Sequence, residues 1–186
     1  MNIANIITIM RLLITPFIVW LILSGYYTMS LLFFIFSGLS DAIDGFIAKK
    51  FNQITILGSY LDPLADKILI VSSILILGFI GIIPSWLLIL IVSRDLAILG
   101  AVIISWIFDS DLKIKPIFSS KINTFLQILY IGFILLNLST FGKFDLLENY
   151  IIPYFSFIIG FFTLLSWIIY LILWLNNIGI ISNKRN

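Results

Sequence analysis

The sequence contains no cysteine and no histidine, and only 11% of its residues are charged. The first absence excludes disulfides and thiolate metal sites, and the second removes the usual general base and the usual zinc ligand. An average soluble domain is roughly 25% charged, whereas this chain is 61% hydrophobic. We therefore expect an integral membrane protein in which carboxylates carry any acid–base or metal chemistry. No basic patch alternates with aromatic residues, so nucleic-acid binding is not expected.

Six long apolar runs divide the chain, and a helix needs roughly 20 apolar residues to span a membrane. The runs predict an all-α membrane protein with six transmembrane helices in a single domain over residues 1–186. Their expected ranges are 12–23, 29–50, 59–79, 85–108, 121–138 and 150–175. Before the first run, Asn5, Thr8 and Arg11 recur at helical spacing, which predicts an N-terminal interfacial amphipathic helix. These three side chains are expected either to meet the lipid headgroups or to line a cavity.

Lysines and arginines flank the predicted spans unequally, and such residues favour the cytoplasmic side. One side holds only Lys143, and the other holds Lys49, Lys50, Lys113, Lys115, Lys121, Lys184 and Arg185. We expect the membrane to be a bacterial inner membrane or its equivalent, and the charge distribution sets the orientation of the chain in it. Both ends and the link between the second and third spans then face the cytoplasm.

Four aspartates gather between residues 41 and 67, on either side of a short polar link. Asp41 and Asp44 lie three residues apart, and Asp62 and Asp66 lie four apart, so each pair shares one face of a helix. Two antiparallel helices would bring all four carboxylates together at the cytoplasmic end. Hard oxygen ligands without histidine or thiolate favour Mg²⁺ or Mn²⁺, and four carboxylates suit two such ions.

The same stretch resembles the signature of the CDP-alcohol phosphatidyltransferases, membrane enzymes that transfer a phosphatidyl or similar group from a CDP-linked donor to an alcohol. Seven of its eight fixed positions match, and the eighth has lysine where the family usually has arginine. The positions are Asp41, Asp44, Gly45, Ala48, Lys49, Gly58, Asp62 and Asp66. Lysine keeps the positive charge but loses the planar, bidentate guanidinium.

The resemblance implies a role for each of these residues. Asp41, Asp44, Asp62 and Asp66 would be metal ligands, and Asp66 would also be the general base that deprotonates the acceptor hydroxyl. The remaining positions would contact the donor: Gly45, Ala48 and Gly58 by leaving room for the nucleotide, Lys49 at a phosphate, and Thr55 as a loop hydroxyl. The family also implies a homodimer.

Two other interpretations of the four aspartates remain at this point. They could form a structural ion-pair network with Lys49, Lys50 and Lys67, although this leaves the helical phasing of both pairs unexplained. They could instead form the translocation site of a divalent-cation transporter. Against a transporter, the acids lie near one end of the spans and no inverted repeat is apparent.

Two further polar groups lie in later spans. Arg94 and Asp95 either neutralise each other as a buried pair, or Arg94 reaches the aspartates and holds a substrate phosphate. Lys121, Thr124 and Gln127 follow at helical spacing in the fifth predicted span. A polar stripe facing lipid would be costly, so we expect it to line the same cavity, with Lys121 as a candidate substrate contact. Asn5 and Thr8 are also candidate substrate contacts.

Three stretches, the first overlapping the signature and the other two beyond it, resemble the cardiolipin synthase branch of the family. They are GSYLDPLADKILI, IIPSWLLILIVSRD and IKPIFSSKINTFLQ. The branch implies transfer of a phosphatidyl group from CDP-diacylglycerol to phosphatidylglycerol, giving cardiolipin and CMP. The alternative acceptor is glycerol 3-phosphate, as in the phosphatidylglycerophosphate synthases.

Overall fold

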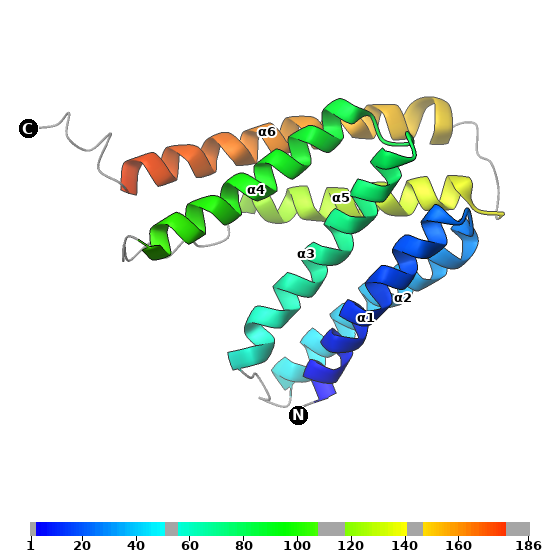
Figure 1. The fold of residues 1–186 in the computed structure, drawn as a ribbon, viewed down its shortest axis with the longest axis horizontal. Coiled ribbons are helices and arrows are strands. Elements are labelled where there is room, and N and C mark those ends of the chain that lie inside the picture. The colour runs from blue at the N-terminus through cyan, green and yellow to red at the C-terminus, as the bar shows by residue number, and fades with distance from the viewer. Residues whose placement is uncertain (1–2, 51–55, 108–117, 141–146, 178–186) are drawn as a thin grey trace, which may run out of the picture. The chain divides into compact units, whose positions relative to one another are not determined.

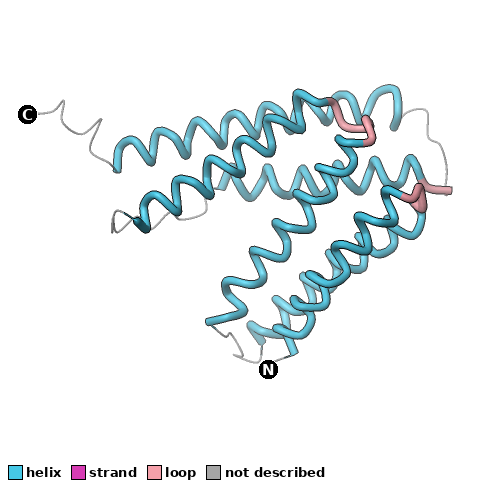
Figure 2. The backbone as a smooth tube through the Cα atoms, viewed as in Figure 1, coloured by secondary structure: helices cyan, strands magenta, loops and turns pink. Residues whose placement is uncertain are grey.

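The computed structural model describes the backbone of residues 3–50, 56–107, 118–140 and 147–177, and it describes side chains for 7–40, 61–100, 119–140, 148 and 150–174. Within these ranges the chain is helical and contains no strand (Figure 2). The helices are α1 (Ile3–Leu23), α2 (Tyr27–Lys50), α3 (Ile56–Phe79), α4 (Ser85–Ile107), α5 (Phe118–Leu138) and α6 (Ile152–Asn177), and the π-helical turn η1 (Leu147–Ile151) precedes α6. The predicted all-α fold class is confirmed.

The chain divides into two compact units, and helix α5 contributes to both. The first unit comprises residues 1–83 and 128–152, and the second comprises 84–127 and 153–186. In the first unit, α1 packs against both α2 and α3 (Figure 1). Thr8 of α1 contacts Asp62 of α3, and Arg11, further along α1, contacts Asp66, further along α3. The two helices therefore run parallel. Helix α2, which connects them, runs antiparallel to both.

Helix α1 has a buried face with a polar half and an apolar half. Thr8, Arg11, Thr15, Ile18 and Ile22 are all buried and follow one another at alternating spacings of three and four residues. This spacing keeps side chains on one face of an α-helix. The N-terminal part of α1 therefore presents polar groups to its neighbours, and the C-terminal part presents isoleucines.

Two glycines end helices in the way their sequence context predicts. Gly25 and Gly81 have positive φ angles of 77° and 80°. At each, the following N–H bonds to a carbonyl five residues back: Tyr26 to Leu21 at 2.9 Å and Ile82 to Leu77 at 3.0 Å. This pattern is the Schellman motif, in which glycine takes the left-handed position at no steric cost.

In the second unit, α4 and α6 approach closely at a glycine. Trp86 stacks on Phe157 with ring centroids 5.5 Å apart. A Cβ atom on Gly160 would lie 2.7 Å from Trp86 Cζ3. The absence of a side chain at Gly160 therefore allows α6 to pack this close to the indole ring of α4.

Large apolar side chains are exposed on the helices of both units, including Leu13 at 71%, Phe36 at 61% and Phe161 at 61%. Two described helical segments, Ser119–Leu138 and Ile152–Trp174, are long and apolar enough to cross a membrane, and Ile7–Leu23 and Tyr27–Ser40 are apolar but shorter. These features point to membrane association. The number of spans remains a prediction.

The structure corrects the expected start of the chain. α1 is continuous from Ile3 to Leu23, without a separate interfacial helix. Its Thr8 and Arg11 side chains are buried, because they have partners on α3.

Candidate active site

Asp62 and Asp66 lie one turn apart on α3, and each is contacted by a side chain of α1. The Thr8 hydroxyl donates a hydrogen bond of 2.5 Å to Asp62 Oδ1. Arg11 forms an ion pair with Asp66 through Nη1 and Oδ1. Two side chains three residues apart on α1 thus meet two carboxylates four residues apart on α3.

The partners of the two carboxylates are buried, whereas the carboxylates themselves are not. Thr8 is 0% exposed and Arg11 is 2% exposed. The Asp66 side chain is 38% exposed, and Asp62 is also partly exposed. Between them, Ala65 is fully buried. One side of this α3 segment is therefore held by α1, while its carboxylates remain accessible to a ligand.

These two aspartates fit a divalent-cation site in the chemistry of their donor atoms. They offer hard oxygen ligands, and each is oriented by a donor from a neighbouring helix, as metal-binding carboxylates commonly are. Among the described side chains, no three acidic residues form a group that could hold an ion. The side chains of Asp41 and Asp44, which lie on α2, are outside the described set.

A second arginine–carboxylate pair is buried in the other unit, on α4. Arg94 Nη1 lies 2.7 Å from Asp95 Oδ1, and the two residues are 2% and 6% exposed. Arg94 Nη2 also donates to Ser120 Oγ at 2.5 Å and to Ser166 Oγ at 2.8 Å. The guanidinium lies 5.8 Å from the centroid of the Tyr170 ring. Arg94 thereby joins α4, α5 and α6.

The sequence model of the CDP-alcohol phosphatidyltransferases matches residues 1–180. The chain belongs to this family. The predicted family is confirmed, and the chain is thereby placed among transferase enzymes.

Several curated members of the family are similar to this chain. A Drosophila melanogaster protein named "Probable cardiolipin synthase (CMP-forming)" is 35% identical over 148 residues, covering 71% of this chain and 46% of that protein. The Homo sapiens "Cardiolipin synthase (CMP-forming)" is 34% identical over 147 residues, covering 70% and 49%. An Oryza sativa subsp. japonica protein, "CDP-diacylglycerol--glycerol-3-phosphate 3-phosphatidyltransferase 1, chloroplastic", is 32% identical over 186 residues, covering 91% and 53%. The chain spans about half the length of these relatives.

The family's signature positions divide between described and undescribed parts of the chain. Asp62 and Asp66 are fully described. Asp41, Asp44, Gly45, Ala48 and Lys49 lie on α2, Gly58 lies on α3 and Asn5 lies on α1, but their side chains are outside the described set. Thr55 lies outside the described residues altogether. The roles expected of these residues stay predictions.

Two members of the polar stripe expected in the fifth span, Lys121 and Gln127, do not share one environment. Lys121 is exposed, whereas Gln127 is fully buried. Residues six apart on an α-helix differ by about 240° in direction, because each residue adds about 100°. The face shared at i, i+3 and i+7 is instead that of Ser120, Asn123 and Gln127, where Asn123 Oδ1 accepts a 3.0 Å hydrogen bond from Thr163.

The sequence predicts Arg11 only as one member of a polar stripe with Asn5 and Thr8, and it does not predict the ion pair of Arg11 with Asp66. Its signal was present, since Arg11 and Thr8 share a helical face in an otherwise apolar segment. A buried charge requires a partner, and the acidic residues before the fifth helix are the four of the signature, Asp95, Asp109 and Asp111. The partner could therefore have been narrowed to a few carboxylates.

Proposed function

We propose that the protein transfers a phosphatidyl group from CDP-diacylglycerol to phosphatidylglycerol, giving cardiolipin and CMP. The observation that carries the proposal is the pair of α1-held, accessible carboxylates, Asp62 and Asp66, within a chain of the CDP-alcohol phosphatidyltransferase family. The choice of acceptor rests on the relatives named as cardiolipin synthases and on the three stretches of sequence described above.

In this proposal the acceptor hydroxyl oxygen attacks the phosphorus on the diacylglycerol side of the donor. A new P–O bond forms, the P–O bond to the CMP phosphate breaks, and CMP leaves. Asp66 takes the proton of the attacking hydroxyl, and its partial exposure gives that hydroxyl access. Asp41, Asp44, Asp62 and Asp66 would hold two Mg²⁺ or Mn²⁺ ions, which supply electrostatic stabilisation of the pyrophosphate charge.

The donor is proposed to lie along α2 and the start of α3. Gly45, Ala48 and Gly58 carry little or no side chain and would let the nucleotide approach the backbone. Lys49 and Thr55 would contact donor phosphate, and Asn5 would contact the bound substrate. The acyl chains would remain in the bilayer.

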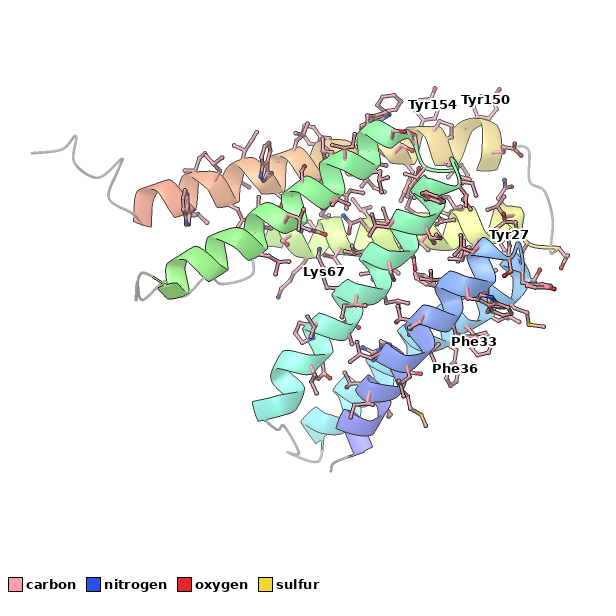
Figure 3. The ribbon with its side chains drawn as sticks, in the orientation of Figure 1. Tyr27, Phe33, Phe36, Lys67, Tyr150 and Tyr154 are labelled. Carbon is pink, nitrogen blue, oxygen red and sulfur yellow. The ribbon has the colours of Figure 1, made fainter. Side chains whose placement is uncertain are left out.

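We also propose that all six helices span the membrane, with the aspartates on the cytoplasmic side, and that the protein is a homodimer. In the first unit, the start of α2 lies beside the end of α5, since Thr28 and Thr140 are hydrogen-bonded at 3.0 Å. Tyr27 and Tyr150, labelled in Figure 3, lie at the start of α2 and in η1. Tyrosines favour membrane interfaces, which supports an interface at the end of the helices away from Asp62 and Asp66.

A transfer assay tests the proposal and separates the two acceptors. Purified protein would be given labelled CDP-diacylglycerol, Mg²⁺ or Mn²⁺, and either phosphatidylglycerol or glycerol 3-phosphate. We expect CMP release and labelled cardiolipin with phosphatidylglycerol. Release with glycerol 3-phosphate alone would identify a phosphatidylglycerophosphate synthase, in keeping with the rice relative.

The cation transporter is tested in the same preparation. The protein would be reconstituted in sealed vesicles containing a Mn²⁺-sensitive dye. A transporter predicts Mn²⁺ flux without CMP release, whereas the proposed transferase predicts CMP release without flux. Membership of the transferase family already favours the second result.

A further inference from the structure

We propose that Thr8 and Arg11 are positioning residues that hold Asp62 and Asp66 in the orientation needed for cation binding and catalysis. The proposal rests on the proposed function, because it assigns α1 a task within that site. Thr8 contacts Asp62 and Arg11 contacts Asp66, each through Oδ1. A carboxylate has two oxygens, so one such contact fixes its orientation without excluding a cation from the other.

Burial makes α1 a rigid support for these contacts. Thr8 and Arg11 are 0% and 2% exposed, so their side chains have little freedom to follow a moving carboxylate. The face that carries them continues into Ile18 and Ile22, which are both 0% exposed. Burial of the apolar half thereby anchors the face of α1 that also carries Thr8 and Arg11.

Polar groups buried on α1 would cost free energy if they had no polar partner on a neighbouring helix such as α3. A charged residue inside a membrane helix is costly, and the structure places Arg11 against the carboxylate that we propose as general base. Thr15, one turn further on, is also buried at 3%, but within the described part of the chain its hydroxyl bonds to its own helix, at the Arg11 carbonyl 2.9 Å away. Among the described side chains, Thr8 contacts an aspartate and Thr15 does not, so the two threonines form a matched pair.

Mn²⁺ binding to the donor-free protein tests Thr8 without requiring activity. Free Mn²⁺ would be measured by electron paramagnetic resonance during titration of the purified wild type and each variant. We expect Thr8→Val to weaken Mn²⁺ binding by about 10- to 100-fold, the usual effect of removing a partner that orients a metal ligand. Thr8→Ser, which keeps the hydroxyl, is expected to restore most of the affinity, and Thr15→Val is expected to bind as the wild type does.

Arg11 is tested by separating turnover from donor binding. Arg11→Gln is expected to lower kcat by about 10- to 100-fold at saturating donor and metal, with a smaller change in donor affinity. Arg11→Lys keeps the charge and is expected to recover part of kcat. Tighter Mn²⁺ binding by Arg11→Gln would overturn the proposal, because it would mean that the guanidinium competes with the cation for Asp66.

The results separate this inference from the proposed function. If the wild type releases CMP but Thr8→Val binds Mn²⁺ with wild-type affinity, the positioning role is wrong and the transferase stands. If no acceptor yields CMP yet Thr8→Val loses Mn²⁺ affinity while Thr15→Val does not, the transferase proposal is wrong and the positioning role stands. If Arg11→Gln fails to fold, Arg11→Lys carries the kcat test, and Thr8→Val with its control Thr15→Val carries the Mn²⁺ test.

Discussion

Replacing Arg94 with methionine tests whether this arginine holds the second unit together or binds substrate. The substitution keeps an unbranched side chain but removes the charge that lies 2.7 Å from Asp95 Oδ1. It also removes the donor to Ser120 and Ser166. If Arg94 is structural, stability falls, and any loss of activity follows from it.

The size of the effect follows from the burial of the pair. The Arg94 and Asp95 side chains are 3% and 7% exposed, so Arg94→Met removes the positive charge beside a carboxylate that lies inside the protein. Breaking a buried ion pair in this way costs about 3 to 5 kcal/mol. Replacing both partners by apolar residues removes that penalty, and the two serines can bond to carbonyls of their own helices. Arg94→Met with Asp95→Leu is therefore expected to recover most of the loss.

Thermal unfolding in detergent, followed by circular dichroism, measures these differences. A loss of 3 to 5 kcal/mol corresponds to a Tm lower by about 6 to 20 °C in a chain of this size. The neighbouring variant Ser93→Ala is the control, because Ser93 is exposed and bonds only to the Leu90 carbonyl of its own helix at 3.1 Å. Its Tm is expected to change by no more than about 2 °C.

One result would refute this reasoning. If Arg94→Met kept the wild-type Tm but lost CMP release, and the double variant recovered nothing, Arg94 would act on the substrate. The hypothesis of a phosphate-binding Arg94 would then replace the structural one.

Three further predictions concern other parts of the chain. Gly160→Ala is expected to cost about 1 to 3 kcal/mol, because its Cβ would meet the Trp86 ring at 2.7 Å, whereas Gly132→Ala, with nothing within 4 Å, is expected to be neutral or stabilising in the same unfolding assay. Gln127→Leu is expected to raise the Tm, because neither polar atom of the buried amide has a hydrogen-bond partner among the described residues. A lower Tm would show that the amide has one. Asp66→Asn is expected to abolish CMP release while CDP-diacylglycerol still binds, and full activity would exclude Asp66 as the base.

The helices were predictable because residues close in sequence determine where each helix begins and ends. Apolar length gave each segment, and Gly25, Gly81 and Pro84 mark the ends where the chain turns. The helix starts and ends that were predicted lie within about three residues of those observed for most segments, because capping and hydrophobicity act over one or two turns. Long-range packing is not needed to predict a helix start or a helix end.

The partners of polar side chains were less predictable, because they depend on which helices pack together. The pair Arg11 and Asp66 joins residues 55 apart in sequence, and a polar stripe on an apolar helix can be satisfied by lipid headgroups as well as by another helix. For Arg94 and Asp95, proximity in sequence suggested the pair, but the contacts with Ser120 and Ser166 on α5 and α6 could not be read from it.

The two arginine–carboxylate pairs differ in the exposure of the acid, and this difference assigns them different tasks. Both arginines are almost fully buried, with side chains 1% and 3% exposed, but Asp66 is 38% exposed and Asp95 only 7%. A carboxylate that binds a cation and accepts a proton from a substrate must be reachable by both. A carboxylate that only neutralises a buried arginine is better shielded, since shielding strengthens the attraction. The pair on α1 and α3 therefore suits catalysis, and the pair on α4 suits assembly of its unit.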